Sequence, residues 1–146
     1  MDQIIDTFVQ DKRLAVAGVS RSGKKFGNMA AKELRERGYQ LYIVHPDAKE
    51  IDGVKCYPRL SDLQGKVDNL LVSVQSKQAL GVLQEASSTG IKNIWLQQGS
   101  ETSELLALAR QLGLKVVSGK CILMYAQPVR SFHGFHRFVM KLIGQL

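Results

Sequence analysis

Residues 15–27 read AVAGVSRSGKKFG, and this stretch decides the expected fold. Its first residues are small and apolar, as in a buried β-strand, while the glycines and serines that follow are typical of a tight loop. Three basic residues then lead into a run with helical spacing. The N-terminus of a helix offers unpaired N–H groups and a partial positive charge, and glycine lets the backbone approach a ligand closely. We therefore expect a strand, a loop and a helix that together hold the phosphates of a nucleotide-like ligand.

Outward from this stretch, strand and helix patterns alternate along the chain. Strands are expected at 13–18, 40–44, 68–74, 92–96 and 114–117, with a short extra strand at 54–57. Helices are expected at 26–37, at 76–89, and from Ser100 or Thr102 to about 112, with a helical turn inside 60–66. Such alternation predicts an α/β, Rossmann-like fold with an open sheet of five parallel strands in the order 3-2-1-4-5 and helices on both faces.

Both ends of the chain add a helix to this sheet. Residues 2–10 predict a leading helix within the segment 1–12, and residues 132–146 predict an amphipathic C-terminal helix. Packing on the sheet is the expected role of the second helix, with a homodimer surface or a membrane-surface contact as alternatives. Because the chain has 146 residues and neither repeats nor linkers, we expect a single domain over residues 1–146.

Composition narrows the class of protein. Hydrophobic residues make up 45% and charged residues 23%, as in ordinary globular proteins, and no run approaches the roughly 18 apolar residues of a membrane span. The acidic start lacks the pattern of a signal peptide, so a cytoplasmic location without membrane partner is expected. The net charge of +7 favours acidic partners such as phosphate ligands. Its basic residues are spread along the chain without an aromatic-plus-basic strand motif, so we expect no nucleic-acid partner.

The predicted strand order locates the ligand. In open parallel sheets, ligands bind beyond the carboxyl ends of the strands, where the strand order reverses. Here that position lies between the first and fourth predicted strands. It would bring the loop at 18–27 next to residues 97–99, with His45 and Pro46 at one side.

The loop partly matches two known phosphate motifs. Gly18, Ser20 and Gly23 occupy the positions of G-x-G-x-x-G, but His45 stands where an NAD site needs an acid. The spacing from Gly18 to Gly23-Lys24 also fits a P-loop, but Lys25 replaces the hydroxyl residue that binds magnesium. The cations of the loop suit a ligand with more phosphate charge than NAD, and coenzyme A (CoA) and NADP both qualify. Solvated charges at a helix start are the alternative.

Several segments within residues 13–125 form an ordered pattern, at 17–21, 25–27, 38–46, 51–58, 94–99 and 113–117 followed by Cys121. This ordered set resembles a known family, the small stand-alone CoA-binding proteins, which are similar to the N-terminal CoA-binding domain of the succinyl-CoA synthetase alpha subunit. In that family pattern, His45 stands where asparagine or a small polar residue is expected.

The resemblance implies a set of CoA contacts. The pyrophosphate would lie on the loop after the first strand, the adenosine end beside the exits of the second and third strands, and the start of the pantetheine arm beside the fourth. The implied contact residues are Gly18, Val19, Ser20, Arg21, Lys24, Lys25, Phe26, Gly27, His45, Pro46, Lys49, Ser73, Val74, Gln97 and Gly99.

Catalytic groups do not stand out. The acidic residues are scattered, and His133 and His136 lack a third ligand, so no metal site is expected. In the synthetases the catalytic histidine belongs to a separate ligase domain. Cys121 either forms a mixed disulfide with the CoA thiol or is a buried inert thiol, and its exposure distinguishes the two. We expect a module that binds CoA or an acyl-CoA without transforming it, with an NADP-type oxidoreductase or a regulatory nucleotide-binding protein as the alternative.

Overall fold

The computed structural model describes residues 2–99 and 101–126. The helix expected at 132–146, its histidines and the homodimer contact considered for it lie outside these residues. Within the described ranges, no helix is both long enough and apolar enough to cross a membrane.

The elements follow the expected alternation of strands and helices. The helices are α1 (Asp2–Gln10), α2 (Phe26–Glu36), α3 (Ser76–Thr89) and α4 (Ser103–Gln111), with the 3-10 helices η1 (Leu60–Leu63) and η2 (Ile122–Met124). The strands are β1 (Arg13–Ala17), β2 (Gln40–Val44), β3 (Glu50–Ile51), β4 (Val54–Tyr57), β5 (Asn69–Val72), β6 (Asn93–Gln97) and β7 (Lys115–Lys120). The expected bounds 2–10, 40–44, 54–57 and 76–89 are confirmed to the residue.

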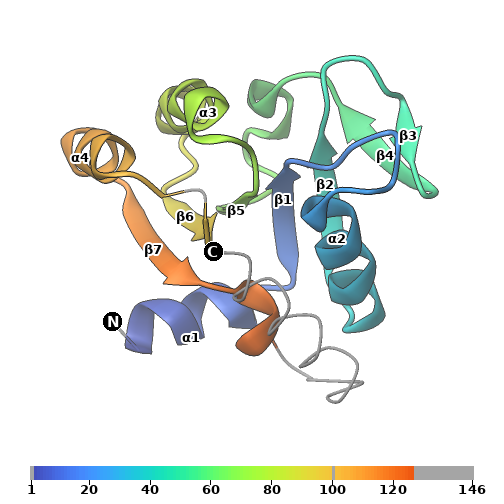
Figure 1. The fold of residues 1–146 in the computed structure, drawn as a ribbon, viewed down its shortest axis with the longest axis horizontal. Coiled ribbons are helices and arrows are strands. Elements are labelled where there is room, and N and C mark those ends of the chain that lie inside the picture. Colours follow the sequence, from blue (N-terminus) through green and yellow to red (C-terminus); the bar gives the residue numbers. More distant parts are fainter. Residues whose placement is uncertain (1, 100, 127–146) are drawn as a thin grey trace.

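The strands form one mixed sheet in the order β3-β4-β2-β1-β5-β6-β7 (Figure 1). Neighbours pair in parallel except β3 and β4, which form an antiparallel hairpin at the edge. The Rossmann-like class is confirmed, but the predicted five-strand order is wrong. The strand expected third, β5, pairs with β1, and the short strand β4 takes the place beside β2.

Burial explains this difference. Leu70, Leu71 and Val72 of β5 are all fully buried, so both faces of this strand need cover, as in the middle of a parallel sheet. In β4 only Cys56 is buried, and the other residues are half-buried or exposed, which suits a place near the edge. A short strand with so little buried surface therefore suits a place near the edge, between β2 and β3.

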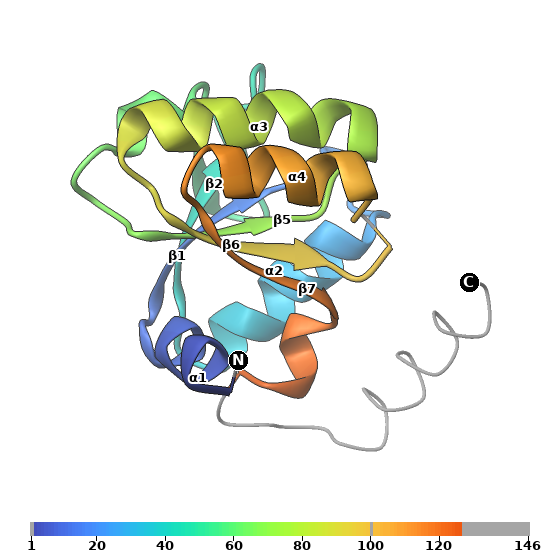
Figure 2. The same cartoon turned by 90° about the vertical axis from the view of Figure 1, so that its left-hand side faces the viewer.

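Helices cover both faces of the sheet, as expected (Figure 2). On one face α1, α2 and η2 enclose a core that contains Leu34, Ile43 and Trp95. On the other face η1, α3 and α4 enclose a second core that contains Leu70, Leu83 and Leu105. Because successive residues of the strands point to opposite faces, β5 and β6 contribute to both cores.

The ends of the helices carry the expected signals. Gly38 has a φ of +91°, and the N–H of Tyr39 donates to the Leu34 carbonyl at 3.0 Å, so α2 ends in a left-handed cap. Of the two residues considered for the start of α4, Thr102 is the N-cap, since its side chain accepts from the N–H of Leu105 at 3.1 Å.

Candidate functional site

The loop after β1 is built on close backbone contacts. It leaves the tip of β1 and returns to the start of α2 (Figure 1). A Cβ atom at Gly18 would lie 2.3 Å from the carbonyl oxygen of Ser73, and one at Gly27 would lie 2.2 Å from the carbonyl oxygen of Gly18. The exits of β1 and β5 and the first turn of α2 therefore meet with no space for a side chain between them.

Asn28 anchors the loop through two side-chain hydrogen bonds. Its side chain is only 4% exposed, and its Oδ1 accepts from the Ser20 N–H at 2.9 Å while its Nδ2 donates to the Ser20 carbonyl at 2.7 Å. Both backbone groups of one loop residue are thus paired with one buried amide, which fixes the loop against α2. Sequence reasoning missed Asn28, although a polar residue among the buried positions of α2 was a signal.

Serine hydroxyls occupy the outer side of the loop. The Oγ atoms of Ser20 and Ser22 lie 2.8 Å apart, and they accept from the N–H groups of Ser22 at 3.1 Å and of Lys24 at 3.4 Å, respectively. Oxygen atoms therefore already lie in front of backbone donors, as the oxygens of a bound phosphate would. At the N-cap of α2, Lys25 makes no side-chain capping hydrogen bond, so the positive end of the helix dipole has no capping side chain there.

Three cations surround this loop. Arg21, Lys24 and Lys25 are all exposed. Arg21 forms an ion pair with Asp47 of the β2 exit at 3.5 Å, and both side chains are more than 60% exposed. Because solvated ion pairs of this kind contribute little to stability, a phosphate group can replace the carboxylate beside Arg21 at small cost.

The exit of β2 lies beside the loop. His45 is half-buried. Its backbone N–H donates to the carbonyl oxygen of Tyr57, at the end of β4, at 2.9 Å. Pro46 and Lys49 are exposed on the segment that continues to β3. Through the contact between Asp47 and Arg21, this segment and the loop after β1 face each other.

The exits of β5 and β6 are not equivalent. The N–H of Ser73 donates to the carbonyl oxygen of Ala17 at 2.8 Å, so Ser73 and Val74 follow directly beside Gly18. Gln97 and Gly99 are one strand farther from β1 than the predicted order implied, because β5 lies between β1 and β6. The Gln97 side chain is buried, and its Oε1 accepts from the N–H of Ile122 at 3.2 Å, so this amide supports η2.

A pocket of about 630 Å³ adjoins the loop on the side of α2. It lies between α2 and the β3–β4 hairpin, with a largely apolar lining that includes Met29, Ile43 and Val54. Val19 and Gly23 connect it with the loop, and Lys32 and Arg35 add positive charge. Its volume falls in the range of roughly 300–1,000 Å³ that is usual for small-molecule sites.

The thiol of Cys121 is not in the state that disulfide exchange needs. Cys121 is only 4% exposed, and burial raises the pKa of its thiol. Both facts agree with the interpretation as a buried thiol, because exchange requires an accessible thiolate. Among residues 2–99 and 101–126, no group of three or more His, Cys, Asp and Glu side chains is placed to hold a metal ion.

Comparison with curated proteins identifies relatives of two lengths. The uncharacterized protein YneT of Bacillus subtilis (strain 168) is 30% identical over 120 residues, which cover 82% of this chain and 89% of that protein. The alpha subunit of the ADP-forming acetate–CoA ligase II of Pyrococcus furiosus is 28% identical over 130 residues. That match covers 82% of this chain but only 28% of the ligase subunit, so the chain spans less than a third of its length.

The solved structures that this chain resembles also include both short proteins and much longer ones. A conserved hypothetical protein from Pyrococcus furiosus has a TM-score of 0.72 and 34% identity, over 75% of this chain and 95% of that one. The dinucleotide-forming acetyl-coenzyme A synthetase 1 of Ca. Korarchaeum cryptofilum, in complex with phosphate and ADP, has a TM-score of 0.67 and 31% identity, over 80% of this chain and 27% of that one. The family model described as the CoA binding domain matches residues 12–127 of the present chain. The chain therefore belongs to the CoA-binding domain family.

Proposed function

We propose that this protein binds CoA, free or as an acyl-CoA, through the loop after β1, and holds it without transforming it. The observation that carries the proposal is the shape of this loop. Asn28 holds Ser20 by both backbone groups, and Lys25, the N-cap of α2, makes no side-chain capping hydrogen bond. A backbone arrangement of this kind at a helix N-terminus binds phosphate groups, and the family supports CoA as their source.

In this proposal the pyrophosphate contacts the loop at residues 18–27, where Arg21, Lys24 and Lys25 supply positive charge. The adenosine end lies beside the exits of β2 and β5, with His45, Pro46 and Lys49 at the first and Ser73 and Val74 at the second. The pantetheine arm begins near Gly99. Gln97 contributes there through its backbone, because its side chain is engaged with Ile122.

The extent of the match supports the proposal of binding without ligation. The chain covers 28% of the Pyrococcus furiosus ligase alpha subunit and less of the other acetate–CoA ligases it matches. We propose that it shares their capacity to hold CoA, while the ligase step depends on parts of those enzymes that the match does not cover.

Calorimetric titration with a series of ligands tests the proposal. CoA, acetyl-CoA, dephospho-CoA, NADP and NAD are each titrated into the protein, and mass spectrometry identifies any ligand that is released from the gently purified protein. We expect CoA and acetyl-CoA to bind most tightly, and dephospho-CoA to bind less tightly because it lacks one phosphate group. Binding of NADP without binding of CoA, or binding of no member of the series, would overturn the proposal.

A further inference from the structure

The side chain of His45 turns back onto the segment that follows β2. Its Nδ1 accepts hydrogen bonds from the N–H of Asp47 at 3.1 Å and from the N–H of Ala48 at 3.0 Å. An imidazole nitrogen accepts a hydrogen bond only when it carries no proton. These two contacts therefore place the proton of the neutral ring on Nε2.

This segment forms one wall of the proposed site. Between His45 and Asp47 lies Pro46, which has no N–H group, so the two donors held by the imidazole are the first that follow it. Asp47 contacts Arg21 at 3.5 Å, and Ala48 is buried in the core on the α2 side. The position of the imidazole thus sets how the segment from residue 46 to residue 49 faces the loop after β1.

We infer that His45 is a positioning residue whose Nδ1 shapes this wall, so that affinity for a phosphorylated ligand falls when the two hydrogen bonds to Nδ1 are lost. The inference about affinity rests on the proposed function, whereas the inference about the shape of the segment does not. An asparagine at this position would offer an oxygen to the same donors, since Asn side chains accept from the N–H groups that follow them in turns.

The two hydrogen bonds depend on the acceptor at Nδ1. Without this acceptor, the N–H groups of Asp47 and Ala48 lose their partner on His45. The charged groups that flank His45 are Arg21 and Asp47, which pair with each other, and the exposed Lys49 and Glu50. Because His45→Asn and His45→Ala leave all of these charged groups in place, a difference in affinity between the two variants reports the acceptor.

Two variants test this role. His45→Asn keeps an acceptor, and His45→Ala removes it. CoA is titrated into the wild type and both variants, and circular dichroism verifies that each is folded. We expect His45→Ala to lose about tenfold in affinity, as for the loss of about one net hydrogen bond. We expect His45→Asn to bind nearly as the wild type does. Equal affinity of the wild type and His45→Ala, or an equal loss in both variants, would overturn the inference.

A measurement without ligand tests the shape of the segment separately. Nitrogen NMR of the ligand-free protein reports which imidazole nitrogen carries the proton, and also reports the amides of Asp47 and Ala48. We expect unprotonated Nδ1 at pH 8, and we expect both amide signals to shift when His45 is replaced by alanine. A proton on Nδ1 at pH 8, or amides that do not respond, would overturn the inference even if CoA binds. If the NMR result is as expected and CoA does not bind, the proposed function fails while the positioning role of His45 stands.

Discussion

Gly18 and Gly27 are positions at which a single added carbon would disturb the site. The nearest atoms to an added Cβ belong to the backbone in both cases, at 2.3 Å for Gly18 and 2.2 Å for Gly27, so no side chain can rotate away. Because these glycines allow β1, β5 and α2 to touch, they bring the start of the helix to the loop. The close contact between these three elements thus has a defined steric cause.

Replacing Gly27 by alanine should displace α2 from the loop. We expect Gly27→Ala to lower the free energy of unfolding by about 1–3 kcal/mol, as for overpacking, and to weaken CoA binding. Gly81→Ala is the matched control, because an added Cβ at Gly81 in α3 meets no atom within 4 Å. That change should stabilise the protein by about 0.5–1 kcal/mol, since alanine favours helix. Urea unfolding and calorimetry measure both effects, and wild-type behaviour of Gly27→Ala would contradict this account of the contact.

The sequence predicts candidate site residues whose role depends on their neighbours in the chain. It misses those whose role depends on how the elements pack. The glycines and cations of the loop follow one another in the chain, so their spacing indicates an anion site. Asn28 was missed because its partner, Ser20, is opposite it only when α2 packs on the loop. Likewise, the sequence shows that His45 is not an acid, but its contacts with Asp47 and Ala48 require the fold of the segment.

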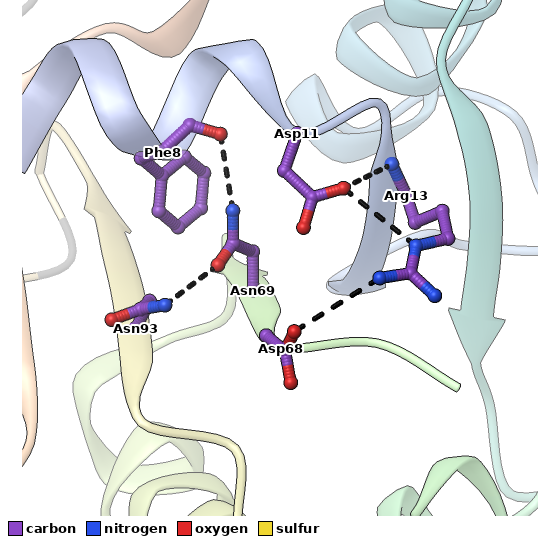
Figure 3. A network of polar contacts seen from close by, with 6 residues as sticks. All are labelled: Phe8, Asp11, Arg13, Asp68, Asn69 and Asn93. Atoms are coloured by element: carbon purple, nitrogen blue, oxygen red, sulfur yellow. Dashed lines mark hydrogen bonds and ion pairs between the residues drawn. The ribbon is translucent and has the colours of Figure 1, made fainter. Parts of the chain in front are cut away.

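At the scale of elements, a polar network connects α1 with the amino ends of the strands (Figure 3). Buried Asn69, at the start of β5, donates to the Phe8 carbonyl of α1 at 3.0 Å and accepts from Asn93 of β6 at 2.9 Å. Close by, Arg13 of β1 contacts Asp11 and Asp68 (Figure 3). The end of α1 and the amino ends of β1, β5 and β6 are thereby linked, on the side of the sheet's strands opposite the candidate site.

Removal of the Asn69 amide should affect stability and leave binding unchanged. Asn69→Ala leaves the buried carbonyl of Phe8 and the half-buried amide of Asn93 without their hydrogen bonds, so we expect a loss of about 1–3 kcal/mol in the free energy of unfolding. Gln84→Ala is the control, because it removes a similar amide from an exposed position of α3 and should change stability by less than about 0.5 kcal/mol. Denaturant unfolding and CoA titration are the measurements. Equal stability of the two variants, or weaker CoA binding by Asn69→Ala alone, would show that this description of the network is incorrect.

Elements were more predictable than their pairing. The bounds of α1, β2, β4 and α3 follow from hydrophobic periodicity and from turn residues, which are local signals. Strand order is not local, because an apolar run such as Leu70–Val72 shows only that a strand is buried and not which strand lies beside it. The two-residue strand β3 gives too short a pattern to reveal the hairpin that places β4 beside β2.

At the scale of the whole molecule, the amino ends and the carboxyl ends of the parallel strands have different roles. The network around Asn69 and the attachment of α1 lie at the amino ends of the strands. The loop after β1 and the exits of β2 and β5 lie together at the carboxyl ends. The reversal of strand order lies between β1 and β5, and the proposed phosphate site lies beyond it, as in other open parallel sheets. The sequence predicted the reversal between the first and fourth predicted strands, whereas it lies between the first and the third, β1 and β5.

The most direct test of the central claim compares two charge-matched double variants. Lys24→Ala/Lys25→Ala removes two exposed cations from the loop, and Lys92→Ala/Lys115→Ala removes two exposed cations at the starts of β6 and β7, at the opposite edge. CoA is titrated calorimetrically into the wild type and both variants, at low and at high salt. We predict that the loop variant loses about tenfold or more in affinity at low salt and less at high salt, whereas the control binds nearly as the wild type does. Unchanged affinity of the loop variant, or an equal loss in both variants, would contradict a CoA site at the loop after β1.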